Sequence, residues 1–154
     1  MRRIDPGPGQ ESVWDYPRPP RIEPEARPVR IVFNGMTVAH SDRAVRVLET
    51  SHPPGIYLPP EDVAAAALRP NTGSSFCEWK GKAAYWDIVV DGAVAEAAGW
   101  SYPEPTQPFS AIAGYLSFYP GRVDACFLGD ERVRPQEGNF YGGWITAEIV
   151  GPFK

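Results

Sequence analysis

Cysteine is scarce in this sequence, and its two cysteines do not form a recognisable pair. Cys77 and Cys126 are the only cysteines among 154 residues. Neither belongs to a C-x-x-C knuckle of the kind that binds zinc. We therefore expect no structural metal, no disulfide and no bound cofactor.

Long apolar runs are also missing. No run approaches the roughly 18 to 20 apolar residues that span a bilayer, and no apolar stretch near the N-terminus resembles a signal peptide. These absences predict a cytoplasmic protein that does not contact a membrane. Neither a G-x-x-x-x-G-K-S run nor a G-x-G-x-x-G run is present, so no phosphate-cradling loop is predicted.

Clustered positive charge is absent too. The formal net charge is -4, and the densest basic positions, Arg2, Arg3 and Arg18, lie in a proline-rich leader. Binding to a nucleic-acid backbone depends on clustered Lys and Arg side chains. We therefore expect no nucleic-acid partner.

What the sequence does contain is enough for one folded domain. Its length fits a single core, and its hydrophobic fraction of 43% is close to the globular average. Residues 1–28 are rich in proline, which indicates an extended arm whose Val13, Trp14 and Tyr16 can dock on the domain. Residues 129–154 are predicted to pack as a C-terminal extension because they carry aromatic side chains around Gly142-Gly143.

The segment between them predicts an antiparallel β fold. Tight turns at Asn34-Gly35, Lys80-Gly81 and Pro120-Gly121 predict three hairpins, and Asp91-Gly92 extends the second into a meander. An alanine-rich run after two early carboxylates indicates one short helix, which Pro70 is expected to end. The fold class predicted is mainly β, an antiparallel curled sheet or sandwich with one short helix. The expected strands are 29–33, 36–40, 43–49, 56–58, 76–79, 82–90, 93–100, 114–119 and 122–127, and the expected helix is 63–68.

Four strings in this region resemble a known family. They are VRVLETSHPPGIYLPPED at 45–62, CEWKGKAAYW at 77–86, WSYPEP at 100–105 and LSFYPGRVD at 116–124. They are similar to the bacterial domain-of-unknown-function family numbered 427, sometimes labelled a putative nucleotidyltransferase domain. The resemblance covers roughly residues 29–128 and implies a β-tent-like domain there. Related β-tent proteins carry paired cysteines for zinc, which this sequence lacks.

The nucleotidyltransferase label can be compared with the residues. Such enzymes resemble one another in a Gly-Ser pair followed by two carboxylates at alternating strand positions, which hold two metals. Gly73-Ser74 and Asp87 are present, but Val89 stands where the second carboxylate is needed and Asp91 falls in a turn. That activity is not expected here.

Aromatic residues are concentrated in the same strings. If their strands are neighbours, the rings can line one cleft that binds a flat or cationic ligand. The alternative is that the rings simply fill the core of a small domain. The candidate ligand-binding residues are Tyr57, Trp79, Tyr85, Trp86, Trp100, Tyr102 and Tyr119.

Four residues are candidates for catalysis. His52 has an ordinary pKa near 6.5, which suits proton transfer, and Glu49 can orient it. Lys80 can activate Cys77 as a thiolate if the two share a face, although a buried, inert thiol is the competing interpretation. His52 also has a plain structural interpretation as a capping or packing residue.

Three functions follow from these observations, and the sequence does not name a substrate. The first is a module that binds a small molecule or a modified residue in the aromatic-lined pocket. The second is an enzyme that uses Glu49, His52, Cys77 and Lys80 for acid-base or thiol chemistry. The third is a scaffold domain that associates with itself, for example as a homodimer, through edge strands.

Overall fold

The computed structural model describes residues 2–138 and 141–154, and strands are the main regular structure among them. Helical segments in this part of the chain are 3-10 turns of three to six residues: η1 (Val13–Asp15), η2 (Pro60–Asp62), η3 (Ala65–Ala67), η4 (Gln107–Ile112) and η5 (Pro120–Arg122). The strands are β1 (Glu11–Ser12), β2 (Arg21–Pro24), β3 (Val29–Phe33), β4 (Met36–Ser41), β5 (Val45–Leu48), β6 (Gly55–Tyr57), β7 (Leu68–Cys77), β8 (Gly81–Val90), β9 (Ala93–Ser101), β10 (Leu116–Phe118), β11 (Ala125–Leu128), β12 (Glu131–Arg132), β13 (Arg134–Pro135), β14 (Trp144–Ile145) and β15 (Ile149–Val150).

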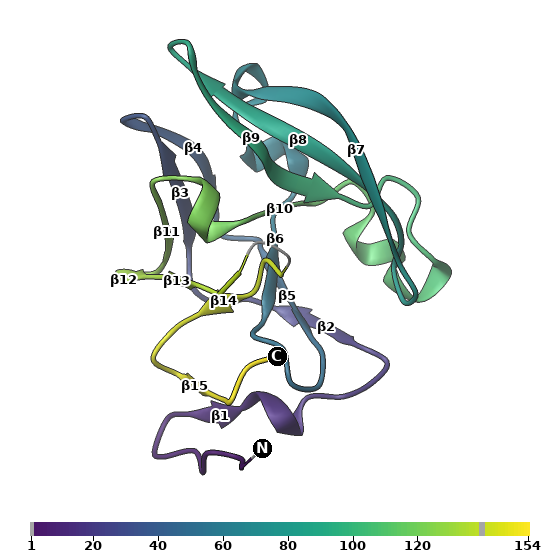
Figure 1. Ribbon diagram of the computed structural model, residues 1–154, viewed down its shortest axis with the longest axis vertical. Coiled ribbons are helices and arrows are strands. Elements are labelled where there is room, and N and C mark those ends of the chain that lie inside the picture. The colour runs from purple at the N-terminus through teal and green to yellow at the C-terminus, as the bar shows by residue number, and fades with distance from the viewer. Residues whose placement is uncertain (1, 139–140) are drawn as a thin grey trace.

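The strands form several small sheets that do not close into a barrel (Figure 1). Two sheets have four strands each, in the orders β10-β9-β8-β7 and β12-β11-β3-β4, and a third has the order β2-β5-β6. All neighbours within these three sheets are antiparallel. A bridge between Leu58 and Leu116 joins the end of β6 to β10. The predicted class, mainly β and antiparallel, is confirmed.

Local turn chemistry explains the two tightest hairpin connections. Asn34 and Gly35 have φ values of 48° and 77°, and Asp91 and Gly92 have φ values of 49° and 83°. Positive φ at both central residues is the requirement of a type I′ turn, whose twist matches that of the strands it joins. The hairpins β3–β4 and β8–β9 form where the sequence predicts them.

The predicted hairpin across Pro120-Gly121 is wrong. These residues begin the 3-10 turn η5, which separates two strands that enter different sheets. Strand β10 pairs with β9, whereas β11 pairs with β3 and β12. Proline fixes its own φ near the helical value, which favours a type I or 3-10 turn over the positive φ values of a tight hairpin.

The region around Pro70 also differs in detail from the prediction. The short helix is the turn η3, and strand β7 begins directly after it at Leu68 and passes through Pro70. Proline lacks the N–H that a residue in a central strand donates to its neighbour. Strand β7 tolerates Pro70 because it is the edge strand of its sheet. Residues 71–75 are polar and mostly exposed, so this part of β7 lacks the alternating hydrophobic pattern that predicts a strand.

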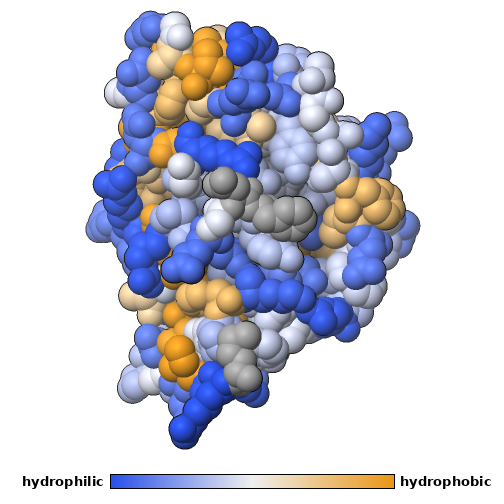
Figure 2. All heavy atoms as spheres, viewed as in Figure 1, coloured by the Kyte–Doolittle hydropathy of each residue, from blue (hydrophilic) through white to orange (hydrophobic). Residues whose placement is uncertain are grey.

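The main core lies between the two four-stranded sheets. Ile31 of β3, Ile88 of β8 and Phe118 of β10 are each less than 2% exposed. Trp144 of β14 joins the same cluster and is 1% exposed. Polar and charged residues cover most of the face in Figure 2, with apolar residues in separate patches.

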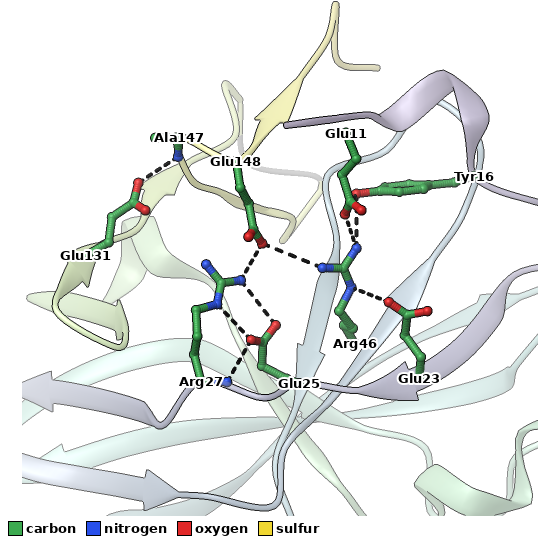
Figure 3. A network of polar contacts seen from close by, with 9 residues as sticks. All are labelled: Glu11, Tyr16, Glu23, Glu25, Arg27, Arg46, Glu131, Ala147 and Glu148. Atoms are coloured by element: carbon green, nitrogen blue, oxygen red, sulfur yellow. Dashed lines mark hydrogen bonds and ion pairs between the residues drawn. The ribbon is translucent and has the colours of Figure 1, made fainter. Parts of the chain in front are cut away.

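The two ends of the chain meet on the domain (Figure 1). Strand β1 pairs in parallel with β15, and Val13 is completely buried. The Arg46 guanidinium of β5 lies among the carboxylates of Glu11, Glu23 and Glu148, which come from β1, β2 and the C-terminal segment (Figure 3). This ionic cluster fastens both terminal segments to β5.

Candidate functional site

A cleft of about 750 Å³ opens between the β5–β6 segment and the β7–β8–β9 sheet. Ten of the eleven residues that the sequence nominates line it: Glu49, His52, Tyr57, Cys77, Trp79, Lys80, Tyr85, Trp100, Tyr102 and Tyr119. Ligand pockets commonly enclose about 300 to 1,000 Å³. The structure therefore brings distant aromatic and ionisable residues to one hollow.

Trp86 is the exception. Successive side chains of a strand point to opposite faces, so Tyr85 faces the cleft and its neighbour Trp86 packs against the main core. The Trp86 indole N–H donates a hydrogen bond of 3.0 Å to Ser101 Oγ. Trp86 therefore does not contribute to this wall.

Buried rings form the floor of the cleft. Tyr57, Trp100, Tyr102 and Tyr119 are all less than 10% exposed and belong to a second hydrophobic cluster. The Trp100 N–H donates to the Tyr57 hydroxyl at 3.3 Å, and the Trp100 and Tyr119 rings lie 4.6 Å apart between centroids. These four rings therefore pack as core, as the competing interpretation expects, and they also present one side to the cleft.

The phenols of the floor keep their protons. Burial raises the pKa of Tyr57 and that of Tyr102 well above the ordinary value of 10. Burial, with a further contribution from Tyr85, raises the pKa of Tyr119 to about 12. At neutral pH these groups offer the cleft neutral hydroxyls.

The rim carries more accessible aromatic side chains. Trp79 and Tyr85 are half-buried, and Phe76 of β7 is 77% exposed, although it is a large apolar residue. Tyr141 lies on the opposite side, with its ring 5.1 Å from that of His52. These rings give the entrance flat apolar surfaces.

Glu49 and His52 face each other within the cleft. The Glu49 Oε2 atom lies 3.8 Å from His52 Nε2. Burial lowers the pKa of His52 below 6.5, Glu49 opposes this shift, and Lys154, Arg18 and Lys80 add to it. The imidazole is therefore mainly neutral at pH 7.

The two cysteines occupy different environments. Cys77 lines the cleft at the end of β7, whereas Cys126 of β11 is 1% exposed and burial raises its pKa strongly. Lys80 lines the same cleft as Cys77. Cys126 is a packing residue, in agreement with its alternating strand.

Asp87 has its own set of partners. Its carboxylate accepts hydrogen bonds from the Ala97 backbone N–H at 2.8 Å, from the Asn71 amide at 2.8 Å and from Arg69 at 3.2 Å. The Ala97 N–H is the first cause of its lowered pKa. Asp87 thus ties β7, β8 and β9 together beside a bulge. No group of three or more His, Cys, Asp or Glu side chains in residues 2–138 and 141–154 is arranged to hold a metal ion.

Several residues that line the cleft are not among the site residues predicted from the sequence. The proline-rich arm contributes Arg18, and the C-terminal segment contributes Gln136, Gly142, Gly143 and Lys154. Gly142 packs flat on the floor, because a Cβ there would lie 2.7 Å from Trp100 Cζ3. The Gly-Gly pair beside Trp144 is the one local feature that could have indicated such a close approach.

Comparison with known proteins identifies the family. A family model described as "Domain of unknown function (DUF427)" matches residues 21–129, more than two thirds of the chain. The chain belongs to the DUF427 family. No curated protein matches it significantly. The lining residues Arg18, Gln136, Gly142, Gly143 and Lys154 lie outside the matched part of this DUF427 protein.

No helix among the described residues of this DUF427 chain has the length and apolar character needed to cross a bilayer.

Proposed function

We propose that this DUF427 protein binds a small planar molecule in the aromatic-lined cleft. The observation that carries the proposal is the convergence of six nominated aromatic residues on one open hollow of about 750 Å³. Aromatic rings prefer offset or edge-to-face contact with other flat systems, worth about 0.5 to 1.5 kcal/mol per pair beyond simple burial. A rim of accessible rings above a rigid floor suits a flat ligand.

The charges of the cleft disfavour a cationic ligand. Arg18, Lys80, Arg122 and Lys154 line the cleft, against the carboxylates of Glu49 and Glu78. Two of the aromatic faces already carry a cation of the protein, since Lys80 Nζ lies 5.8 Å from the Tyr102 ring centroid and the Arg122 guanidinium 3.9 Å from that of Tyr119. A quaternary ammonium or methylated lysine would meet like charge there.

The first test combines thermal-shift screening with an exposed rim residue. A panel of nucleobases, nucleosides and aromatic acids should contain compounds that raise Tm, because a ligand at 100 times its Kd stabilises a protein by about 2.7 kcal/mol. We expect Phe76→Ala to leave the Tm of the free protein unchanged, because Phe76 is 77% exposed. The same change should weaken binding of the hits about three- to tenfold through loss of one ring contact.

Val94→Ala is the matched control, because Val94 is 47% exposed on β9 and does not line the cleft. It should alter neither Tm nor affinity. The proposal fails if no planar compound in the panel raises Tm, or if both variants bind the hits as tightly as the wild type does.

A second candidate function rests on the Glu49–His52 pair. Glu49 Oε2 lies 3.8 Å from His52 Nε2, longer than a hydrogen bond, so the carboxylate acts on the imidazole through its charge and is close enough to orient it after a small movement. A mainly neutral imidazole at pH 7 can accept a proton, so the pair favours general-base chemistry on a ligand held against the rings. Cys77 and Lys80, in the same cleft, are the further candidate reactive groups.

The charges around His52 give this candidate a measurable signature. We expect the His52 ring to titrate below pH 6.5 in NMR spectra, with His40→Asn used to assign the signals. Glu49→Gln should lower the midpoint further, because the Glu49 charge raises the His52 pKa, and Lys80→Met should raise it, because the Lys80 charge lowers it. A midpoint at or above 6.5, or one that neither variant moves, would remove the basis for a Glu49-oriented base.

A further inference from the structure

Lys80 is a largely buried residue whose ammonium has no anionic partner in the described part of the chain. It lies in the turn between β7 and β8 and is 8% exposed, yet it lines the cleft. Its Nζ atom contacts the Tyr102 ring at 5.8 Å from the centroid. Within residues 2–138 and 141–154, no carboxylate or carbonyl oxygen forms an ion pair or hydrogen bond with this ammonium.

Two of the other three cations that line the cleft already have contacts, and the third, Lys154, is exposed. Arg18 Nε lies 3.8 Å from Glu49 Oε2, and Arg18 Nη2 donates to the Thr50 carbonyl at 3.2 Å. Arg122 donates to the Ala97 carbonyl at 2.8 Å and stacks on Tyr119. The Lys80 Nζ atom reaches the solvent of the cleft, so Lys80 is the half-enclosed cation that a bound anion can contact there.

Gln136, which also lines the cleft, has a buried oxygen atom without a hydrogen-bond partner among the described residues. Gln136 is 8% exposed, and its Nε2 donates to the Lys154 carbonyl, whereas its Oε1 accepts no hydrogen bond from the described residues. Buried acceptors are normally satisfied in folded proteins. Lys80 and Gln136 both line the cleft, so an occupant with polar groups as well as a flat ring matches its wall.

We propose that the ligand is a planar ring compound that carries an anionic group, and that this group binds the Lys80 ammonium. The inference rests on the proposed binding function and adds the chemical class of the ligand. A carboxylate and a phosphate supply the same charge-assisted hydrogen bond to Lys80. The aromatic floor and rim bind the ring, and Lys80 selects the acid over its neutral analogue.

Calorimetric titration of the full chain with matched probes tests this. One pair is indole-3-carboxylate and indole-3-carboxamide, and the other is adenosine monophosphate and adenosine. In the wild type we expect the anionic member of at least one pair to bind about tenfold or more tightly than the neutral member, the scale of a hydrogen bond to a charged group. The pair that shows the preference tells whether a carboxylate or a phosphate is the better partner.

Lys80→Met should abolish the preference while leaving the affinity for the neutral member unchanged. Lys82→Met is the matched control, because Lys82 is exposed on β8, does not line the cleft and should keep the full preference. Lys80→Met should leave the Tm of the ligand-free protein largely unchanged, because the ammonium has no ion pair with the described residues and methionine keeps most of the contact with the Tyr102 ring. This second readout requires no ligand and shows that the variant is folded.

The outcomes separate this inference from the proposed function. If neutral and anionic members bind the wild type equally, or if Lys80→Met keeps the preference, the anion inference is overturned and planar binding stands. If Lys80→Met lowers the Tm of the free protein, Lys80 has a structural partner and the inference is again overturned. If no member of either pair binds, the anion inference fails, and so does the proposal that the cleft binds planar indole or adenine compounds.

Discussion

Trp144→Ala should lower the free energy of unfolding by about 3 to 5 kcal/mol, the usual range for removing a large buried aromatic side chain. Trp144 is 1% exposed and packs in the main core beside residues of both four-stranded sheets. Its indole N–H donates a 3.0 Å hydrogen bond to the Phe118 carbonyl of β10. The truncation leaves a cavity and also removes the donor from a buried carbonyl. Urea unfolding followed by tryptophan fluorescence and by circular dichroism measures the loss.

The expected effect of Trp144→Ala extends to the cleft. Gly142 and Gly143, directly before Trp144, lie against the cleft floor and against Pro53. Once β14 loses its anchor, this covering segment is expected to lift from Trp100. We therefore expect faster quenching of tryptophan fluorescence by acrylamide and weaker binding of any planar ligand in the variant.

Trp144→Phe separates packing from the hydrogen bond. It keeps most of the buried ring and removes the N–H, so it should cost only about 1 to 3 kcal/mol, the penalty for an unsatisfied buried carbonyl. If Trp144→Ala were as stable as the wild type, the C-terminal segment would be a dispensable appendage, and its contribution to the cleft wall would have to be abandoned.

The parts of the fold that sequence reasoning predicts are those set by local chemistry. Asn34-Gly35 and Asp91-Gly92 dictate their turns because few other residues adopt positive φ, and the flanking strands follow. The pairing of β10 with β9, and of β11 with β3, depends on contacts far apart in the chain. The proline turn at Pro120 disfavours a tight hairpin, but nothing local specifies which distant strands β10 and β11 pair with.

The candidate site shows the same division. The aromatic strings pointed to a shared cleft, and strand alternation alone could have shown that Tyr85 and Trp86 cannot face the same hollow. Arg18 and Gln136 could not be found in this way. They reach the cleft because the terminal segments fold back on β5 and the core. Proline-rich and irregular segments have no hydrophobic periodicity from which their packing position can be predicted.

Arg46→Met should lower the free energy of unfolding by about 2 to 3 kcal/mol at neutral pH. The Arg46 side chain is 10% exposed and joins three carboxylates, with Nε 3.1 Å from Glu23 and Nη1 3.6 Å from Glu148, besides its contact with Glu11 (Figure 3). Methionine matches the aliphatic stem and leaves Glu148 paired with Arg27 and Glu23 paired with Arg21, whereas the Glu11 carboxylate loses its ion pair and keeps its hydrogen bond from Tyr16. Breaking a fully buried pair costs about 3 to 5 kcal/mol, and the partial exposure of the three glutamates reduces that penalty.

Arg43→Met is the matched control, because it removes the same kind of charge from an exposed cluster. Arg43 is 59% exposed and pairs with Glu61 and Asp62 at the surface, where such pairs contribute between about 0 and 1 kcal/mol. Urea unfolding of both variants at pH 7 should separate them clearly. Equal stability losses would mean that the Arg46 cluster is merely another set of surface ion pairs.

The dependence of this loss on pH follows from Glu11. Burial alone would raise the Glu11 pKa, but hydrogen bonds from Tyr16 and Arg46 and the Arg46 charge lower it below its usual 4.5. A carboxylate with a depressed pKa stabilises the fold above its unfolded value and loses that contribution as the pH falls through its folded value. The gap between wild type and Arg46→Met should therefore be full at pH 7 and should narrow below pH 4.5. A gap that stays constant to pH 3 would show that Arg46 acts by packing and not by charge. In either case Arg46→Met should also lower the affinity of the cleft for a planar ligand, because the Arg46 cluster holds the terminal segments that bring Arg18 and Gln136 to the wall of the cleft.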